Sequence, residues 1–249
     1  MNQSEENLLQ AASAVEVCGR RQLLRAAAVT VGGGTAAAVA YRAHSRGDTG
    51  ACETRVMTTG MRYSDLLPDV QCRTQTDRSV RLVTDLIRDR IAIVSFMYTQ
   101  CNGICPATVG LFQKLRAPLY REFGDRVQLI SITLDPLVDS VARLRTYAAA
   151  FGAADEAGAQ RSQAAWTFLT GDAAGLEQIR RGFGYIDPDP QRDRDRTQHA
   201  ALFTFGDDAT NRWCTFPTGL PVEQALAGVI RICGTSATQR YGSLAVPQG

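Results

Sequence analysis

Two cysteines separated by three residues carry the strongest chemical signal in this sequence. Cys101 and Cys105 follow an apolar run, and Pro106 directly after them is suited to the first position of a helix. Both sulfurs are therefore expected in a turn at a helix N-terminus, where partial positive charge favours thiolate over thiol. Two such thiolates can form a disulfide or bind a soft metal, and copper(I) prefers thiolate ligands.

The spacing of the pair bears on this choice. An ordinary redox thioredoxin motif has two residues between its cysteines, and here there are three. The wider pair tolerates a metal between the sulfurs more easily. A metal would still need a third ligand from elsewhere in the chain.

Histidine is the natural source of that ligand, and the sequence contains two. His44 lies ahead of the predicted domain and is interpreted as incidental. His199 stands at the start of a predicted edge strand, after a charged loop, from where it can fold back toward the cysteine turn. On the residues alone a structural role is the more common one for a lone histidine, so both roles stay open at this point.

The elements that must position these residues follow from hydrophobic periodicity. Apolar runs at 91–98 and 127–133 predict central strands covered on both faces, with a further strand at 166–170. Hairpins are predicted from 70–74 with 80–83, and from 199–205 with 212–216.

Helices are predicted between these strands at 106–123, 140–151, 173–181 and 221–233. Pro118 is expected to kink or divide the first helix near Ala117. Residues 185–197 are expected to be a charged loop. Strands that alternate with helices and end in a hairpin and a helix predict an α/β, thioredoxin-like fold, a mixed sheet with flanking helices.

The segment before the domain has the layout of an export leader. Arg20-Arg21-Gln22-Leu23-Leu24 precedes a weakly apolar stretch, as in a twin-arginine signal peptide, and Ala38-Val39-Ala40 is a possible cleavage site. The expected location is the periplasm, or a membrane anchor facing it, with membrane contact only through an uncleaved N-terminus. The domain organisation is then as follows: export signal or anchor at 1–43, polar tether at 44–64, folded domain at 65–234, and C-terminal tail at 235–249.

Composition excludes several classes of protein. The chain has 249 residues, with 27 basic and 25 acidic side chains and a net charge of +2. That balance does not suit nucleic-acid binding, which depends on neutralising many phosphates. No run of about 18 apolar residues is present, so a protein with several membrane spans is also excluded.

Four segments stand in the order of a known family. They are Phe96–Pro106 around the cysteines, Asp135–Ser140, Trp166–Gly171, and His199 after its acidic loop. In this order they resemble the Sco/SenC family of copper-binding proteins, over roughly residues 63–233.

The resemblance implies a function and a site. Cys101, Cys105 and His199 correspond to the family's copper ligands. The implied work is to deliver copper to, or to reduce and so prepare the cysteines of, the dinuclear copper site (CuA) of cytochrome c oxidase. Its copper subunit is the expected partner, alongside other copper or thiol-redox proteins. Asp135 and Asp139 are either turn and helix-capping residues or contacts to His199 around the metal.

Some cysteines lie outside the family pattern. After the leader, six of the seven cysteines remain, and an even number in an exported chain permits disulfides. The pairing of Cys52, Cys72, Cys214 and Cys233 stays open. Cys214 and Cys233 fall in predicted core elements and are expected to be buried thiols.

Three other functions use the same residues. A thiol–disulfide oxidoreductase would use the Cys101–Cys105 pair, with His199 only tuning a thiol. A peroxide-reducing enzyme would centre on one cysteine of low pKa, which a pair fits less well. A copper-responsive signalling protein would keep all three residues. The sequence favours a metallochaperone over an enzyme and leaves copper(I) or copper(II) open as the working state.

Overall fold

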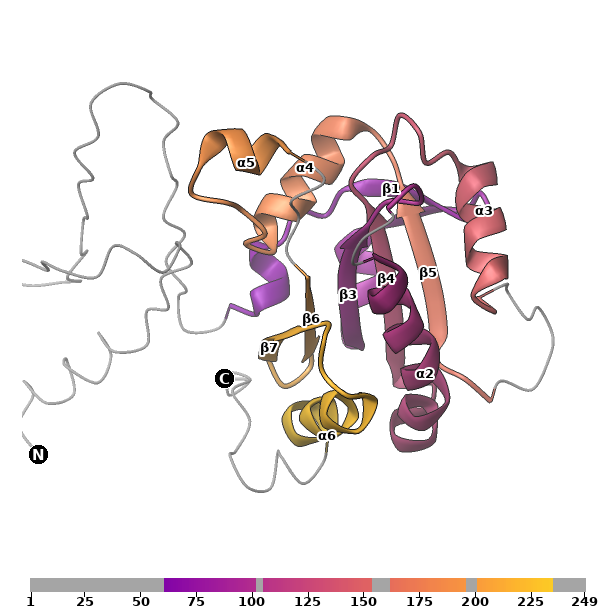
Figure 1. The fold of residues 1–249 in the computed structure, drawn as a ribbon. Coiled ribbons are helices and arrows are strands. Elements are labelled where there is room, and N and C mark those ends of the chain that lie inside the picture. The colour runs from indigo at the N-terminus through magenta and orange to yellow at the C-terminus, as the bar shows by residue number, and fades with distance from the viewer. Residues whose placement is uncertain (1–60, 102–104, 154–161, 196–200, 235–249) are drawn as a thin grey trace, which may run out of the picture. The chain divides into compact units, whose positions relative to one another are not determined.

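The computed structural model describes residues 61–101, 105–153, 162–195 and 201–234. Within them one sheet has the strand order β2-β1-β5-β4-β3-β6-β7 (Figure 1). Strands β3, β4 and β5 are parallel to one another, and the other pairs are antiparallel. The strands are β1 (Gln71–Thr74), β2 (Ser79–Arg81), β3 (Ile91–Met97), β4 (Val127–Thr133), β5 (Ala165–Thr170), β6 (Leu202–Asp207) and β7 (Arg212–Pro217). This is the mixed α/β, thioredoxin-like sheet that the sequence predicts.

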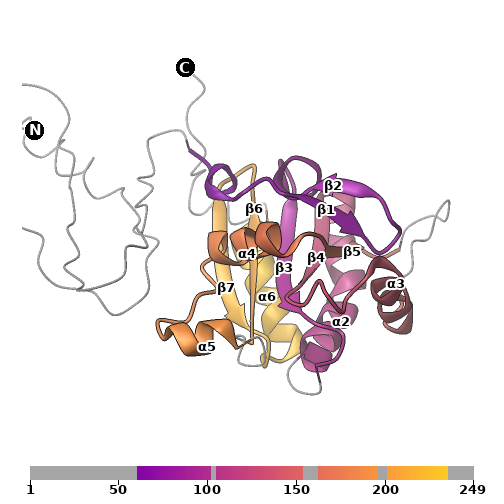
Figure 2. The same cartoon turned by 90° about the horizontal axis from the view of Figure 1, so that it is seen from above.

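Helices cover both faces of the sheet (Figure 2). One core lies between the sheet and α2, α3 and α6, and a second lies between the sheet and η2 and α4. The longer helices are α2 (Cys105–Phe123), α3 (Val141–Ala150), α4 (Ala173–Gly182) and α6 (Val222–Cys233), and the shorter ones are η1 (Tyr63–Leu66), the π-helix η2 (Leu82–Ile87), η3 (Gly124–Arg126) and α5 (Pro190–Arg194).

Strand β3 lies at the centre of the sheet and leads to the cysteines. Every residue of β3 is buried, because Ile91, Ile93 and Met97 face one core while Ala92 and Val94 face the other. A strand covered on both faces reads as a continuous apolar run, which is why its sequence predicted it so well.

Helix α2 does not divide at Pro118, although division was one of the two outcomes expected there, and a kink at the proline stays a prediction. It runs unbroken from Cys105 to Phe123 with the proline inside it. Leu115 and Leu119, on either side of the proline, are fully buried in the core. Their burial stabilises the helix enough to offset the hydrogen bond that proline cannot donate.

The expected charged loop at 185–197 contains a short helix, α5. Asp189 accepts a hydrogen bond from the backbone N–H of Gln191 at 2.9 Å, and Pro190 occupies the first turn. Arg180 of α4 binds the Asp193 carboxylate at 2.8 Å and holds α5 against the domain. Capping and ion pairing therefore order a segment whose composition alone reads as loop.

The strand predicted at 199–205 was expected at the edge of the sheet, and this expectation was wrong. Strand β6 lies between β3 and β7, and β7 is the outer strand. The hairpin adds β7 outside β6, because the buried Phe203 and Phe205 of β6 need cover from the neighbouring elements.

The first described residues are bound to the far end of the β6–β7 hairpin. Arg62 pairs with Asp208 at 3.0 Å, and the backbone N–H of Tyr63 donates to the Asn211 side chain at 2.7 Å. The expected leader, the tether up to residue 60 and the tail at 235–249 lie outside the described residues. No helix in the described part of the chain is both long enough and apolar enough to span a membrane.

Candidate metal centre

The cysteine turn begins where β3 ends, at the carboxyl edge of the parallel strands. The backbone N–H of Cys101 donates to the carbonyl of Tyr98 at 3.2 Å, which closes a turn directly after the strand. Cys105 is the first residue of α2. Cys101 is 9% exposed and Cys105 is 1% exposed, so the two sulfurs belong to the core beneath the turn. Residues 102–104 between them lie outside the described residues.

Both cysteines are reduced thiols that are not joined in a disulfide. Burial is the largest cause that raises the pKa of Cys105 to about 12, and a hydrogen bond with the Cys101 side chain raises it further. Backbone hydrogen bonds at the helix start act in the opposite direction. Desolvation therefore outweighs the helix N-terminus at Cys105, and this thiol keeps its proton at neutral pH until a metal or an oxidant displaces it.

Two tyrosines that the sequence analysis did not single out flank the thiols. A hydrogen bond with the Cys101 side chain is the largest cause that raises the pKa of Tyr98 to about 12. Burial raises the pKa of Tyr147 on α3, and the charges of Cys105 and Cys101 add to that effect. A tyrosine three residues before a cysteine was a usable signal, but the position of Tyr147 depends on how α3 packs.

Asp139 fastens the cysteine turn to the loop after β4. Its carboxylate is fully buried and accepts hydrogen bonds from the hydroxyl and the backbone N–H of Thr99, the latter at 3.1 Å. It also accepts from the Thr133 hydroxyl at 2.6 Å. Arg143 donates to the Thr99 hydroxyl at 2.8 Å from the first turn of α3. The backbone that leads to Cys101 is thereby fixed by a carboxylate that lies 40 residues beyond Thr99 in the sequence.

Asp135 shapes the same loop through its backbone. Its carbonyl accepts from the N–H of Asp139 at 2.9 Å, and its own N–H donates to the Thr133 hydroxyl at 2.9 Å. The cap of α3 is Ser140, whose side chain accepts from the N–H of Arg143. Asp135 is thus a turn residue, and Asp139 is a buried link rather than the cap. A contact from either aspartate to His199 stays a prediction.

His199 lies outside the described residues, but the segments on both sides of it can be placed. Strand β6 pairs antiparallel with β3, so the start of β6 lies at the end of β3 where the cysteine turn begins. On the other side, Asp195 is near enough for its charge to raise the pKa of Tyr98. Among the described residues, no group of three or more His, Cys, Asp or Glu side chains could hold a metal.

The other described cysteines are also free. Cys233, at the end of α6, is buried, and Cys214 on β7 is half-buried against the same core. The expectation of a buried thiol is confirmed for Cys233, whereas Cys214 is a thiol that is only half-buried. Cys72 on β1 is buried, and burial raises its pKa to about 11.

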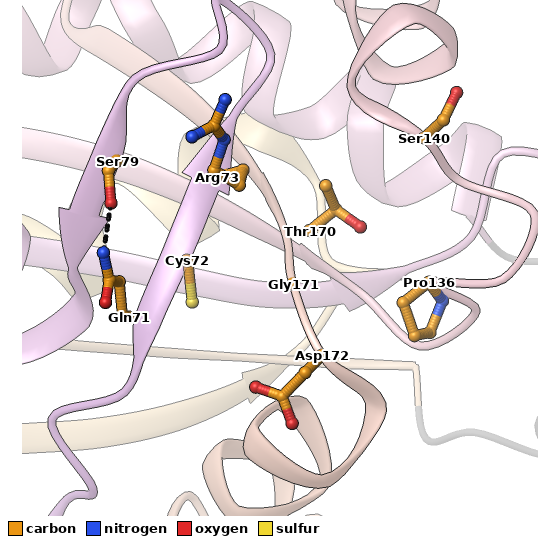
Figure 3. A pocket seen from close by; sticks show the side chains of 9 residues that line it. All are labelled: Gln71, Cys72, Arg73, Ser79, Pro136, Ser140, Thr170, Gly171 and Asp172. Carbon is orange, nitrogen blue, oxygen red and sulfur yellow. Dashed lines mark hydrogen bonds between the residues drawn. The ribbon is translucent and has the colours of Figure 1, made fainter.

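A surface cavity of about 520 Å³ lies between the β1–β2 hairpin and the start of α4 (Figure 3). Arg73, Thr170 and Asp172 line it, and neither Cys101 nor Cys105 does. Pro136 and Ser140 on its wall belong to the loop whose Asp139 holds Thr99. The same loop supports the cavity and the cysteine turn, but the two adjacent thiols lie in the turn and do not line the cavity.

Comparison with known proteins agrees with this geometry. A model of the SCO1/SenC family matches residues 74–234, more than half of the chain. A curated relative from Stutzerimonas stutzeri, whose name describes it as copper-binding, is 27% identical over 118 residues. The match covers 47% of this chain and 52% of the relative, so the chain spans about half the length of the curated relative it matches.

Solved structures of low sequence identity share the fold. Arabidopsis thaliana ScoI with copper bound is 16% identical, with a TM-score of 0.51 over 67% of this chain and 96% of its own. BsSco, described as a member of the Sco family of cytochrome c oxidase assembly proteins, is 22% identical. Its TM-score is 0.50 over 66% of this chain and 90% of its own. At these identities the likeness supports a shared fold alone.

Proposed function

The chain belongs to the SCO1/SenC family, and from that premise we propose that it binds copper and serves the assembly of cytochrome c oxidase. The observation that supports the proposal is the pair of adjacent, reduced thiols where β3 leads into α2. The descriptions of the relatives, one copper-binding and one a cytochrome c oxidase assembly protein, support it.

The thiols present fit copper. Thiolate sulfur is a soft donor that selects copper(I), and the hydrogen bond between the two side chains places the sulfurs side by side. Burial beneath the turn keeps water from competing for the metal. Because Cys105 holds its proton at neutral pH, copper must displace that proton, and its affinity should weaken as the pH falls.

We assign the third donor to His199. It precedes β6, whose start lies beside the end of β3, and imidazole is a good ligand for both states of copper. Asp139 serves this site indirectly, because its bonds to Thr99 fix the backbone that leads to Cys101. The finer role we propose is transfer of copper to the CuA site of cytochrome c oxidase, or reduction of the cysteines there.

Copper analysis of purified protein tests the proposal. We expect one copper per chain after reduction and loss of that copper after oxidation, because a Cys101–Cys105 disulfide cannot donate two thiolates. His199→Ala should weaken copper binding strongly and leave the thiol titration unchanged. Equal copper binding by oxidised and reduced protein would place the site elsewhere.

Dithiol exchange measured on the same samples separates the alternative function. If His199→Ala keeps wild-type copper affinity but loses disulfide exchange, the protein is a thiol–disulfide oxidoreductase instead. The role in the cell is tested by deleting the gene and measuring the CuA signal of the oxidase. Restoration by the wild type, but not by Cys101→Ser, is the expected result.

We further propose that the protein works in the periplasm after export directed by Arg20 and Arg21. Replacing both arginines with lysine preserves charge but removes the planar pair that a twin-arginine signal presents. The variant should stay inside the cell, as measured by fractionation. Unchanged export would exclude this signal and leave the copper proposal intact.

A further inference from the structure

Tyr98 occupies the position between the end of β3 and the first cysteine. Its carbonyl accepts the Cys101 backbone N–H at 3.2 Å, so the turn fixes these two residues relative to each other. Its half-buried ring packs against the core cluster that contains Cys101 and Cys105.

The phenol hydroxyl forms a hydrogen bond with the Cys101 side chain. A phenol O–H is a hydrogen-bond donor and sulfur is a weak acceptor, so the hydroxyl of Tyr98 is the donor in this bond. Tyr147 offers a contrast within the same cluster. Burial is the largest cause of the raised pKa of Tyr147, and the two cysteines contribute to it through their charge.

We propose that Tyr98 is a positioning residue that holds the Cys101 sulfur by an O–H···S hydrogen bond and stabilises the reduced dithiol against the Cys101–Cys105 disulfide. A thiol or thiolate sulfur accepts such a bond better than a disulfide sulfur does, so the bond favours the reduced state. The inference deepens the proposed function, and it rests on that function for the assignment of the two cysteines as the working pair.

Exchange with oxidised glutathione measures this preference directly. The reaction forms the Cys101–Cys105 S–S bond and breaks that of oxidised glutathione. Two electrons and two protons pass from the protein to oxidised glutathione, which becomes two molecules of reduced glutathione. Its equilibrium constant needs no copper, so it is measured on the metal-free full chain.

Tyr98→Phe removes the hydroxyl and keeps the ring. We expect the equilibrium constant to shift about tenfold toward the disulfide, since a hydrogen bond to a charged or polarisable acceptor is worth roughly that much. For this two-electron couple, tenfold corresponds to a potential about 30 mV more negative. The matched control Tyr147→Phe removes a neighbouring hydroxyl and should leave the constant within about twofold of wild type.

Two further measurements keep the test independent of how well the variant folds. Incorporating 3-fluorotyrosine at position 98 strengthens the donor and should shift the constant toward the dithiol. In copper(II)-loaded Tyr98→Phe, the sulfur-to-copper absorption should move to lower energy, because the thiolate loses its hydrogen bond.

The outcomes separate this inference from the proposed function. An unchanged exchange constant in Tyr98→Phe, or an equal change in Tyr147→Phe, overturns the role of Tyr98 even where copper binds normally. Failure of the wild type to bind copper overturns the proposed function, while a tenfold shift in the exchange constant would still establish the hydrogen bond.

Discussion

Two pairs of cysteines contribute to one core, but one pair lies at the N-terminus of a helix and the other at the C-terminus of a helix. Cys105 opens α2, and Cys101 is in the turn before it, whereas Cys233 closes α6 beside Cys214 on β7. A helix start offers backbone N–H groups and positive charge to a sulfur, and a helix end offers carbonyls and negative charge. Burial raises the pKa of Cys105 and of Cys233 alike. Backbone hydrogen bonds oppose that rise at Cys105. The charges of Arg126 and Arg212 oppose it at Cys233.

The two pairs share proximity and burial but differ in the groups that surround their sulfurs. Cys214 and Cys233 also lie near enough for their charges to interact. They lack the turn that Asp139 fastens through Thr99 and the hydroxyl that Tyr98 directs at sulfur. The pairs should therefore differ in metal binding, reactivity and effect on stability.

The largest difference that we expect between the two pairs is in their contribution to copper affinity. Cys101→Ser or Cys105→Ser should reduce copper affinity by more than about 100-fold, beyond what is lost when a residue supporting a ligand is changed. Cys214→Ser and Cys233→Ser should leave it unchanged within about threefold. Competition with a copper(I) chelator measures both, and a comparable loss in the second pair would end the distinction.

We expect a smaller difference between the two pairs in the rate at which their thiols react. Cys101 lies in the turn before α2 and is 9% exposed, and the helix start favours its thiolate. Cys233 is 5% exposed at a helix end, and burial raises its pKa, so its thiolate is scarce. Iodoacetamide should modify Cys101 at least about tenfold faster than Cys233 in the folded, metal-free protein. Peptide mass spectrometry gives both rates, and denaturant should make them nearly equal. Equal rates without denaturant would contradict the contrast.

The smallest expected effect is on stability at alkaline pH. Burial raises the pKa of Cys233 above its usual value of 9.0, so above pH 9 the unfolded chain loses a proton that the folded chain keeps. The stabilisation is complete below pH 9 and is lost as the pH rises, by up to about 1.4 kcal/mol per pH unit for this thiol.

Cys233→Ala provides the matched control for that pH dependence. Its stability should fall less steeply from pH 9 to 10.5 than that of the wild type, although it starts lower because of the cavity left by the sulfur. Urea unfolding measures both slopes. Parallel slopes would show that Cys233 does not titrate differently in the folded and unfolded states.

The sequence predicted the central strands well because their environment leaves a simple pattern. The apolar run at 127–133 is β4 residue for residue, and the run at 91–98 exceeds β3 by one residue. Division of α2 at Pro118 was the part of the prediction for that helix that failed, since the burial of Leu115 and Leu119 that keeps α2 continuous is a property of the packed helix. Helix α5 was missed because an ion pair to Arg180 of another helix holds it.

The candidate site also contains residues that the sequence predicted and residues that it did not. Cys101 and Cys105 were found because strand, turn and helix start lie next to each other along the chain. The link from Asp139 to Thr99 joins residues 40 positions apart, and it exists only because β3 and β4 are neighbours in the sheet. Sequence periodicity does not indicate contacts between residues that are distant in the chain, so the contacts of Thr99 and Tyr147 could not be predicted.

X-ray absorption at the copper edge of the copper-loaded, reduced protein tests the central claim most directly. The account predicts two sulfur ligands from Cys101 and Cys105 and one nitrogen ligand that is lost in His199→Ala. Copper with no sulfur ligand in the wild type, or with two sulfur ligands retained in the Cys101→Ser, Cys105→Ser double variant, would contradict it.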